Sequence, residues 1–281
     1  MKIEVKNIFY KYNKFDKDSD YDIKGISIDI LNNDYLAIVG ETGSGKSTFV
    51  QHLNGLIKAD LGDILIDGVS IYSKNYDMQK LKFKVGLVFQ YPEYQFFSET
   101  VLEDVSFGAI NMGFSKEEAN KKAEYALKMM GIEKEYFDKF PFILSGGEKR
   151  KVAIAGILVM EPDVLILDEP QAGLDPMSKK ELFNILNKLH KMGKTIIIIT
   201  HNMEDVIENA KRVAALKNGK IIAVDYVENF FMNNEIINNI NLMKPEQILL
   251  IEKLKKKYND IDLSKIREKE IIDEIKQTIH L

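Results

Sequence analysis

The stretch Gly40-Glu41-Thr42-Gly43-Ser44-Gly45-Lys46-Ser47 follows the pattern Gly-x-x-x-x-Gly-Lys-Ser, and a nearly all-apolar run, Tyr35–Val39, precedes it. The residues that follow, Lys46–Leu56, are predicted to form a helix. The glycines would let backbone N–H groups curl around an anion, and the helix would add its positive end. Lys46 would reach the β- and γ-phosphates, while the Ser47 hydroxyl would coordinate Mg²⁺. The pattern predicts a nucleotide-binding P-loop, which alone does not distinguish kinases, GTPases and motor ATPases.

A second motif is the apolar run Val164–Leu167, which ends at Asp168 and Glu169 and is closed by Pro170. A carboxylate at the end of a buried strand beside a P-loop can hold Mg²⁺ through water. The neighbouring carboxylate is then free to polarise the attacking water. Without the P-loop, two acids facing solvent would be the simpler interpretation. With it, we predict that Asp168 lies on the metal side and that Glu169 is the catalytic base.

Patterns of apolar residues predict an α/β fold around these motifs. Continuous runs are typical of strands buried on both faces of a parallel sheet, and alternating runs are typical of half-buried strands. The predicted strands are Ile3–Phe9, Ile23–Ile30, Tyr35–Val39, Asp63–Asp67, Val85–Phe89, Val164–Leu167, Thr195–Ile199, Arg212–Leu216 and Ile221–Val224. Asn218-Gly219 indicates a hairpin between the last two. We therefore expect a parallel core sheet with an antiparallel β flank.

The remaining segments are predicted to be helical. From Ser98 to Phe142 the pattern is helical, and Ser115 with Glu118 forms a capping box. This part is predicted to be a helical subdomain, at about residues 98–160, inside a domain of residues 1–225. Residues 226–281 turn polar, Asn-rich and helical, which predicts a small C-terminal helical extension. A pair of solvated charged helices is an equally good interpretation of this extension.

The composition limits the partners of the protein. Its net charge of −4 gives no support for a nucleic-acid partner, because phosphate backbones attract an excess of Lys and Arg. The chain has no cysteine, which excludes disulfides and Cys-ligated metals and fits a reducing cytoplasm. No stretch approaches the ~20 apolar residues needed to cross a bilayer. Any membrane role would therefore come through a partner.

A third motif, Leu144-Ser145-Gly146-Gly147-Glu148, is placed to begin a helix, with Ser145 as N-cap and Glu148 at the capping-box position. The two glycines are costly there, since each weakens a helix by roughly 1 kcal/mol. Bare backbone beside a positive helix end is what the close approach of a γ-phosphate needs. The motif therefore predicts a phosphate clamp, in addition to a well-capped helix start.

Together, the motifs over about Ile3 to Val224 resemble the ATP-binding cassette (ABC) family, whose signature is Leu-Ser-Gly-Gly-Gln. The resemblance implies that Gln90 is the Q-loop glutamine, which contacts Mg²⁺, and that Asp175 belongs to the D-loop. His201 matches the switch histidine that contacts the γ-phosphate. Tyr12 resembles the aromatic residue that stacks on adenine, and Tyr10 is its rival. Since the signature of one subunit closes on ATP held by another in this family, a functional dimer is implied.

Three stretches carry a narrower resemblance to the ATPase subunits of energy-coupling factor transporters: Gln51–Leu56, Gln90–Gln95 and Val152–Gly156. These complexes import vitamins and transition metal ions such as cobalt or nickel. The implied partners are a second ABC ATPase subunit, identical or related, a transmembrane coupling subunit and a substrate-binding membrane subunit. The resemblance places the chain at the cytoplasmic face of the cell membrane as a peripheral subunit. It also implies that the extension helps pairing and that the stretch Tyr91–Phe107 forms a groove for coupling helices.

The sequence departs from the family pattern at Glu148, Glu41 and Gln171, where Gln, His and Thr are common. We expect the Glu148 carboxylate to accept a hydrogen bond from the Ser145 N–H rather than to repel the incoming phosphate. The predicted cofactors are ATP and Mg²⁺. The predicted ATP-binding residues are Tyr12, Gly40, Glu41, Thr42, Gly43, Ser44, Gly45, Lys46, Ser47, Thr48 and Gln90, with Ser145, Gly146, Gly147 and Glu148 acting in trans. The predicted metal-side residues are Ser47, Gln90 and Asp168, and the catalytic ones are Glu169 and His201, with Asp175 in the D-loop.

Other functions stay open at this point. Another class of ABC transporter subunit is one alternative, and a soluble ABC ATPase is a second. DNA-repair ABC proteins carry long coiled coils between the Q-loop and the signature, but the interval Gln90–Ser145 is short and lacks sustained heptads. Translation factors of this family usually have two cassettes and basic linkers, and neither is present. A non-enzymatic scaffold is disfavoured by the complete set Lys46, Asp168, Glu169 and His201.

Overall fold

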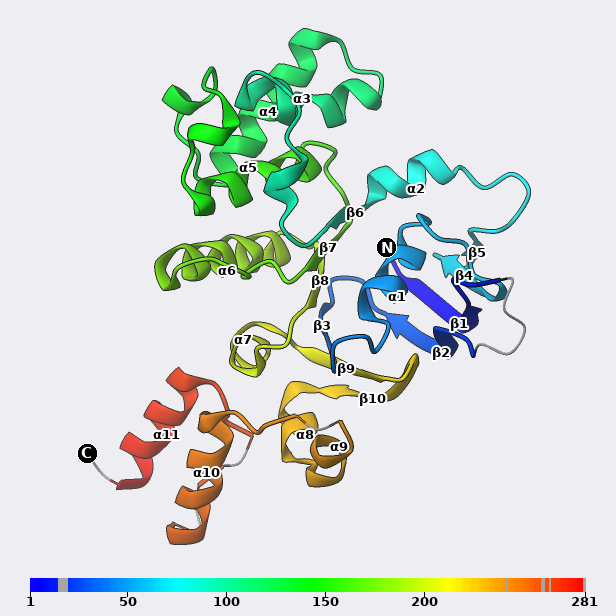
Figure 1. Ribbon diagram of the computed structural model, residues 1–281. Helices are drawn as coiled ribbons and strands as arrows, with labels where there is room; N and C mark the ends of the chain where they lie inside the picture. Colours follow the sequence, from blue (N-terminus) through cyan, green and yellow to red (C-terminus); the bar gives the residue numbers. More distant parts are fainter. Residues whose placement is uncertain (15–19, 241, 259–260, 263, 280–281) are drawn as a thin grey trace.

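The computed structural model describes residues 1–14, 20–240, 242–258, 261–262 and 264–279 (Figure 1). Its strands are β1 (Ile3–Tyr10), β2 (Ile23–Ile30), β3 (Tyr35–Val39), β4 (Leu61–Ile66), β5 (Val69–Ser70), β6 (Val85–Val88), β7 (Val164–Asp168), β8 (Thr195–Ile199), β9 (Arg212–Lys217) and β10 (Lys220–Tyr226). Its α-helices are α1 (Lys46–Leu53), α2 (Met78–Lys84), α3 (Val101–Asn111), α4 (Lys116–Met129), α5 (Gly146–Leu158), α6 (Pro176–Lys191), α7 (Met203–Asn209), α8 (Val227–Met232), α9 (Asn234–Asn239), α10 (Glu246–Lys257) and α11 (Glu268–Ile279). Three short 3₁₀ helices are η1 (Pro92–Gln95), η2 (Lys134–Tyr136) and η3 (Pro141–Ile143).

Two sheets form the centre of the molecule. The six-stranded sheet has the order β10-β9-β3-β8-β7-β6, and all its pairs are parallel except the β9–β10 hairpin. The four-stranded sheet, β2-β1-β4-β5, is antiparallel. The predicted parallel core and antiparallel flank are therefore confirmed. Asn218 and Gly219 both have positive φ, the backbone that a two-residue hairpin turn requires.

The parallel sheet is buried on both faces, which explains its continuous apolar strands. In β3, Tyr35 and Val39 point into the core that lies beneath the helices, whereas Leu36 and Ile38 point into the core shared with the antiparallel sheet. The same alternation holds in β7 and β8. No solvent-facing position is left in these strands, so no polar alternation is expected in their sequence.

Helices α3, α4 and α5 form a group at the top of Figure 1, and α5 packs this group against β6 of the parallel sheet. Helix α4 starts at the predicted capping box, in which Ser115 and Glu118 bond reciprocally. Its buried face carries Ala119, Ala123, Ala126 and Leu127, and the three small alanines let neighbouring helices approach closely. Helix α5, which begins with the signature residues, buries its apolar side chains in the same core as β3, the strand that leads into the P-loop.

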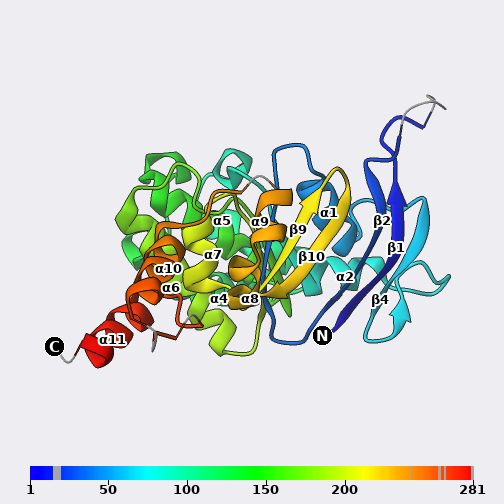
Figure 2. The same cartoon turned by 90° about the horizontal axis from the view of Figure 1, so that it is seen from below.

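The C-terminal extension lies at the bottom of Figure 1, opposite to α3, α4 and α5, and it faces the viewer in Figure 2. It is not a solvated helix pair, because α8 buries Phe230 and Phe231 in the larger core and α10 buries Ile248 there. Ile251 forms a separate small cluster with residues of α11 and the segment before it. None of the described helices has the length and apolar character needed to span a bilayer.

Two local details differ from the sequence-based predictions. Helix α1 ends at Leu53 rather than at Leu56, since the Asn54 side chain accepts a hydrogen bond from the Leu56 N–H and Gly55 has a φ of +70°. Helix α2 was not predicted, although Asp77 caps it by accepting from the Lys80 N–H. Only Leu81 of α2 is buried, so the segment lacks a clear helical stripe.

Candidate functional site

The predicted P-loop joins β3 to α1 at the carboxyl edge of the parallel sheet, where ligands bind in open α/β folds. Gly40 must be glycine, because a Cβ there would lie 2.1 Å from the Leu216 carbonyl oxygen. The Lys46 Nζ donates to the Gly40 and Glu41 carbonyl oxygens, at 2.8 Å each. Burial lowers the pKa of Lys46, and the Glu169 and Asp168 carboxylates oppose that shift. The cation is therefore held inside the loop, facing two acids.

Ser47 and Asp168 meet as the sequence predicted. The Ser47 hydroxyl donates to the Asp168 Oδ2 at 2.6 Å, across 121 residues of sequence. Asp168 is the last residue of β7, which the sheet order places two strands from β3. Burial raises the pKa of Asp168, and the bond from Ser47 partly offsets this shift. The pair presents two oxygen donors to the pocket.

Glu169 is held by three hydrogen-bonding contacts in an uncommon backbone conformation. Its φ is +48°, uncommon for a residue with a side chain, and its N–H donates to the Ile199 carbonyl oxygen at 2.9 Å. His201 Nδ1 lies 2.8 Å from Glu169 Oε1. Gln171 Nε2 donates to Glu169 Oε2 and to the Thr200 Oγ1, both at 2.7 Å. The contact of Gln171 was not predicted from the sequence. It ties the Glu169 carboxylate a second time to the segment after β8, through Thr200.

One pocket of about 430 Å³ collects most of the predicted site. Its lining residues are Asp22, Thr42, Gly43, Gly45, Lys46, Ser47, Thr48, Gln90, Asp168, Glu169, Ile199 and His201. Ser44 is buried in the wall of the loop, while Glu41 is exposed. The P-loop, the strand acids, Gln90 and His201 are thus brought together by four different segments.

Tyr12 stands beside this pocket and is more than half exposed. Its hydroxyl lies 3.2 Å from the Thr48 Oγ1 at the start of α1. Tyr10 is half-buried and packs edge-on against the buried His52, with ring centroids 5.0 Å apart. Of the two tyrosines, Tyr12 is the one free to stack on a flat ligand.

The signature residues do not reach this pocket, since none of its described lining residues comes from 144–148. Ser145 caps α5, and the Glu148 Oε2 accepts from the Ser145 N–H at 2.9 Å and from its hydroxyl at 2.7 Å. The expected bond of Glu148 is confirmed. A Cβ on Gly146 would have no neighbour within 4 Å, whereas one on Gly147 would lie 2.6 Å from the Ser178 Oγ.

We predict opposite effects for alanine at these two glycines. The Gly147→Ala change pushes Ser178 off its 2.6 Å bond to Asp175, so the variant should be about 1–2 kcal/mol less stable than Gly146→Ala. Gly146→Ala should be at least as stable as the wild type, because alanine has a higher helix propensity than glycine. Denaturant unfolding measures both. Equal stabilities would show that Gly147 has no packing role within its own chain.

Asp175 caps α6, and its carboxylate accepts from the N–H groups of Met177 and Ser178. Those bonds, with the Ser178 hydroxyl first, lower the pKa of Asp175. The predicted D-loop residue thus lies beside Gly147 of the signature rather than in the pocket. Arg150 was missed altogether, since a lone arginine in the first turns of a helix gives no sequence signal; it is fully buried next to Glu93.

Comparisons with known proteins agree with this geometry. The profile of the ABC transporter family matches residues 23–172. The chain is 43% identical over 259 residues to the energy-coupling factor transporter ATP-binding protein EcfA2 of Clostridium perfringens, covering 92% of this chain and 91% of that protein. It is 44% identical over 282 residues to EcfA2 of Ligilactobacillus salivarius, covering 98% and 96%.

Solved structures give the same result. The structure of cbiO1 from Clostridium perfringens, described as part of the ABC transporter complex cbiONQ, is 42% identical with a TM-score of 0.74, covering 89% of this chain and 98% of that one. A dimeric, post-hydrolysis state of the ATP-binding cassette MJ0796, bound to ADP and Pi, is 27% identical with a TM-score of 0.69, covering 80% and 98%. The chain therefore belongs to the ABC transporter family, as an ABC ATPase of its energy-coupling factor group.

Proposed function

We propose that this chain is the ATP-hydrolysing subunit of an energy-coupling factor importer, powering uptake of vitamins or transition metal ions through membrane partners. The observation that supports this most is the meeting of Lys46, Ser47, Asp168, Glu169 and His201 around one pocket. ATP-dependent uptake by the chain reconstituted with its membrane partners tests the proposal. Uptake that continues without the chain, or without ATP, would contradict it.

The side chains divide the work of phosphoryl transfer, which needs positioning and electrostatics more than covalent chemistry. Lys46 neutralises the β- and γ-phosphates from inside the loop. Glu169 accepts a hydrogen bond from the attacking water and polarises it, while His201 holds one oxygen of that carboxylate and faces the γ-phosphate. Tyr12 stacks on the base, and the remaining loop residues bind phosphate through their N–H groups.

The donor set fits Mg²⁺. Ser47 and Asp168 supply a hydroxyl and a carboxylate oxygen 2.6 Å apart, and Gln90 lines the same pocket. Among the described residues no group of three His, Cys, Asp or Glu side chains could hold a metal alone. This matches Mg²⁺, which is usually bound by one or two carboxylates together with substrate phosphates. When bound, the ion would neutralise charge on the phosphate oxygens.

The site is completed by a second ABC ATPase subunit, identical or related. Ser145, Gly146, Gly147 and Glu148 lie outside the pocket of their own chain, and Gly146 leaves open space before the positive end of α5. That geometry fits a phosphate held by the partner. The Glu148 carboxylate is occupied by Ser145, so it is turned toward its own helix start. Two bound nucleotides would then join the subunits, and hydrolysis would loosen them.

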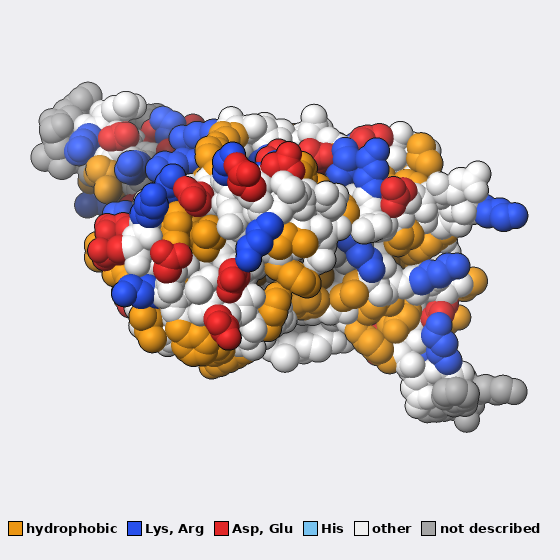
Figure 3. Space-filling model, turned by 90° about the horizontal axis from the view of Figure 1, so that it is seen from above, with side chains coloured by type: hydrophobic (Ala, Val, Ile, Leu, Met, Phe, Trp, Pro, Cys, Tyr) orange, Lys and Arg blue, Asp and Glu red, His pale blue; other side chains and the backbone are white. Residues whose placement is uncertain are grey.

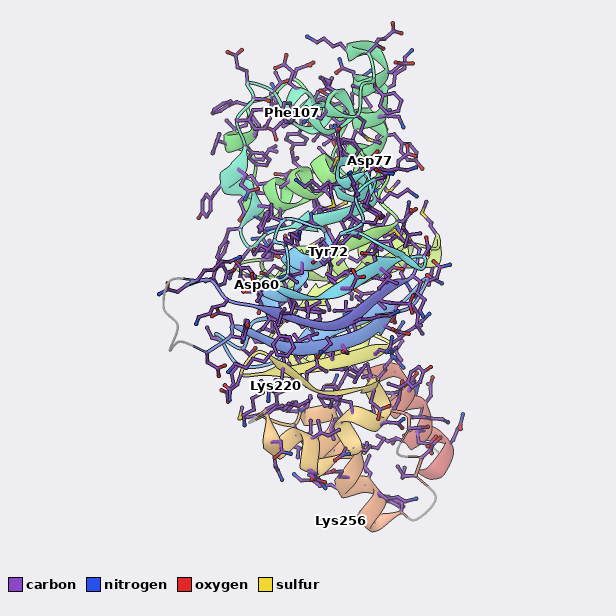
Figure 4. All side chains as sticks on the ribbon, turned by 90° about the vertical axis from the view of Figure 1, so that its right-hand side faces the viewer. Asp60, Tyr72, Asp77, Phe107, Lys220 and Lys256 are labelled. Atoms are coloured by element: carbon purple, nitrogen blue, oxygen red, sulfur yellow. The ribbon has the colours of Figure 1, made fainter. Side chains whose placement is uncertain are left out.

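A second cavity, of about 230 Å³, is the proposed groove for a coupling helix of the membrane subunit. Phe97 is 64% exposed, and its ring packs edge-on against Phe107, 4.8 Å away. Phe96 also lines this cavity, but its side chain is buried in the helical core, so it supports the wall and offers little exposed surface. Hydrophobic side chains are exposed between charged ones on the face seen from above (Figure 3). Phe107 and Lys256 lie at opposite ends of the molecule (Figure 4), which separates the groove from the extension proposed to help pairing.

The Phe97→Ser variant should fail to join the membrane partners, because the groove loses an exposed aromatic anchor worth about 2 kcal/mol or more. Binding to the membrane partners is measured by co-purification of the complex. It is also measured by co-sedimentation with membrane vesicles that expose the cytoplasmic face. Tyr125→Ser, which removes a similarly exposed aromatic ring on α4, is the matched control. Unchanged recruitment of the Phe97 variant would rule out the groove as the docking site.

A further inference from the structure

Arg150 is the largest side chain among the described residues that are fully buried. It lies in α5, five positions after the signature residue Ser145. Its guanidinium forms a bidentate pair with Glu93 of η1, with Nε to Oε2 at 2.8 Å and Nη2 to Oε1 at 3.0 Å. Glu93 follows the pocket residue Gln90 closely in sequence. One edge of the guanidinium therefore holds the Q-loop.

The other edge of the guanidinium holds the turn that follows Glu169. Arg150 Nη1 donates to the Pro170 carbonyl oxygen at 2.9 Å, and Nη2 donates to that of Ala172 at 3.1 Å. The Glu169 carbonyl oxygen is 3.4 Å from Nη1. Arg150 thus contacts Glu93 on one side and the backbone of residues 169–172 on the other, and it is not among the described residues that line the pocket.

Backbone strain lies at both ends of this link. Glu169 has a φ of +48° and Tyr91, between Gln90 and Glu93, has a φ of +52°. Residues with side chains persist in this region only where the surroundings hold them, at a cost of about 1–3 kcal/mol each. The Tyr91 ring also faces the guanidinium, 5.7 Å from its centre. Arg150 contacts both segments and so adds to the restraint of each.

Arginine is suited to this place and lysine is not. A planar guanidinium offers five N–H donors in a fixed fork, so it can bond a carboxylate and several carbonyl oxygens together. An ammonium has three donors around one point and cannot span the distance between Glu93 and the Pro170–Ala172 turn. Burying a charge is costly unless it is fully paired, so the arrangement is stable only while both sides stay in contact.

From these contacts we infer that Arg150 is a positioning residue, which sets the place of Glu169 and links it rigidly to the Q-loop through Glu93. The inference rests on the proposed role of Glu169 as the base. When the Q-loop shifts, Glu93 moves the guanidinium, and the guanidinium moves the Pro170–Ala172 turn and Glu169 with it. Hydrolysis is then sensitive to what occupies the groove beside η1, because Pro92 and Gln95 line that groove.

The test compares Arg150→Lys, Glu93→Gln and the double variant of the full chain in steady-state hydrolysis of Mg·ATP. Arg150→Lys should lose at least about tenfold in kcat with KM changed by no more than about threefold, because a small misplacement of a reacting group is enough to slow the chemistry. Glu93→Gln, which keeps the size of the side chain, should lose about fivefold. The double variant should be no slower than Arg150→Lys, because both changes disrupt the same interaction between Arg150 and Glu93.

The matched control is Arg212→Lys. Arg212 forms another buried pair, with Asp34 at 2.6 Å, and also donates to a backbone carbonyl, but it lies on β9 away from Glu169. Its kcat should stay within about twofold of wild type even if its stability falls. Thermal unfolding identifies any variant that does not fold. If Arg150→Lys does not fold, the kcat of Glu93→Gln alone tests the link. Wild-type kcat in Glu93→Gln, or effects of the two changes that simply multiply, would overturn the link.

Glu169→Gln separates this inference from the proposed function. If that variant is inactive while Arg150→Lys and Glu93→Gln hydrolyse at the wild-type rate, only the role of Arg150 is wrong. If Glu169→Gln itself hydrolyses ATP normally, the assignment of the base is wrong, whatever the Arg150 variants do.

Discussion

Glu169→Gln should bind Mg·ATP with unchanged affinity and hydrolyse it at least about a hundredfold more slowly. Glutamine keeps the size of the side chain and can still accept from His201, so the pocket should keep its shape. The neutral amide is a far weaker acceptor for the proton of the attacking water, so the base function is lost. Single-turnover phosphate release measures the rate, and equilibrium binding of a fluorescent ATP analogue measures the affinity.

Glu117→Gln is the control for this experiment. Glu117 pairs with Lys121 on the surface of α4, and such exposed pairs contribute about 0–1 kcal/mol. Its hydrolysis should match the wild type. Normal turnover by the Glu169 variant would show that Glu169 is not the catalytic base. Lys46 and Asp168 would then still form a nucleotide-binding site, and another group would act as the base.

The second large effect concerns the active site shared between two subunits. Lys46→Ala removes the phosphate cation, and Gly146→Glu places a carboxylate where the partner's phosphate is proposed to approach. Each variant alone should lose at least about a hundredfold in hydrolysis. A Cβ added at Gly146 would meet no atom within 4 Å in its own chain, so this variant should fold normally.

Mixing the two variants should restore activity. In a random mixture of identical-fold subunits, half of the dimers are mixed, and each mixed dimer has one site with an intact P-loop and an intact signature. Up to about a quarter of the wild-type rate should therefore return, because the two sites of a twofold dimer are equivalent. The mixture is assayed at fixed total protein against each variant alone. Failure of the mixture to exceed the sum of its parts would argue that the signature does not act in trans.

Much of the fold was predictable because its signals are local. The P-loop depends on a strand, glycines and a helix that adjoin in sequence, and the Ser115–Glu118 capping box closes within one helical turn. The two-sided burial of β3, β7 and β8 left continuous apolar runs that indicate a parallel sheet without further information. These features depend on residues that are adjacent in sequence, so they can be predicted from a single sequence.

The contacts that restrain the site residues could not be predicted from local patterns. Ser47 and Asp168 were expected to meet only because both belong to known motifs, but Arg150 with Glu93, and Gln171 with Thr200, belong to none. Arg150 and Glu93 are 57 residues apart, and which side chain fills the space between α5 and η1 depends on how the helical group packs on the sheet. The burial of Phe230 in the larger core was hidden for the same reason.

The sequence by itself determined the nucleotide chemistry and the family, since the P-loop, the strand acids and the signature each occupy a few consecutive residues. Only the tertiary structure decided how Glu169 is restrained, which aromatic residue is exposed beside the pocket, and that the signature lies outside the pocket of its own P-loop. The physical reason is that a local motif needs only adjacent backbone, whereas restraint and exposure depend on which distant segments pack against it.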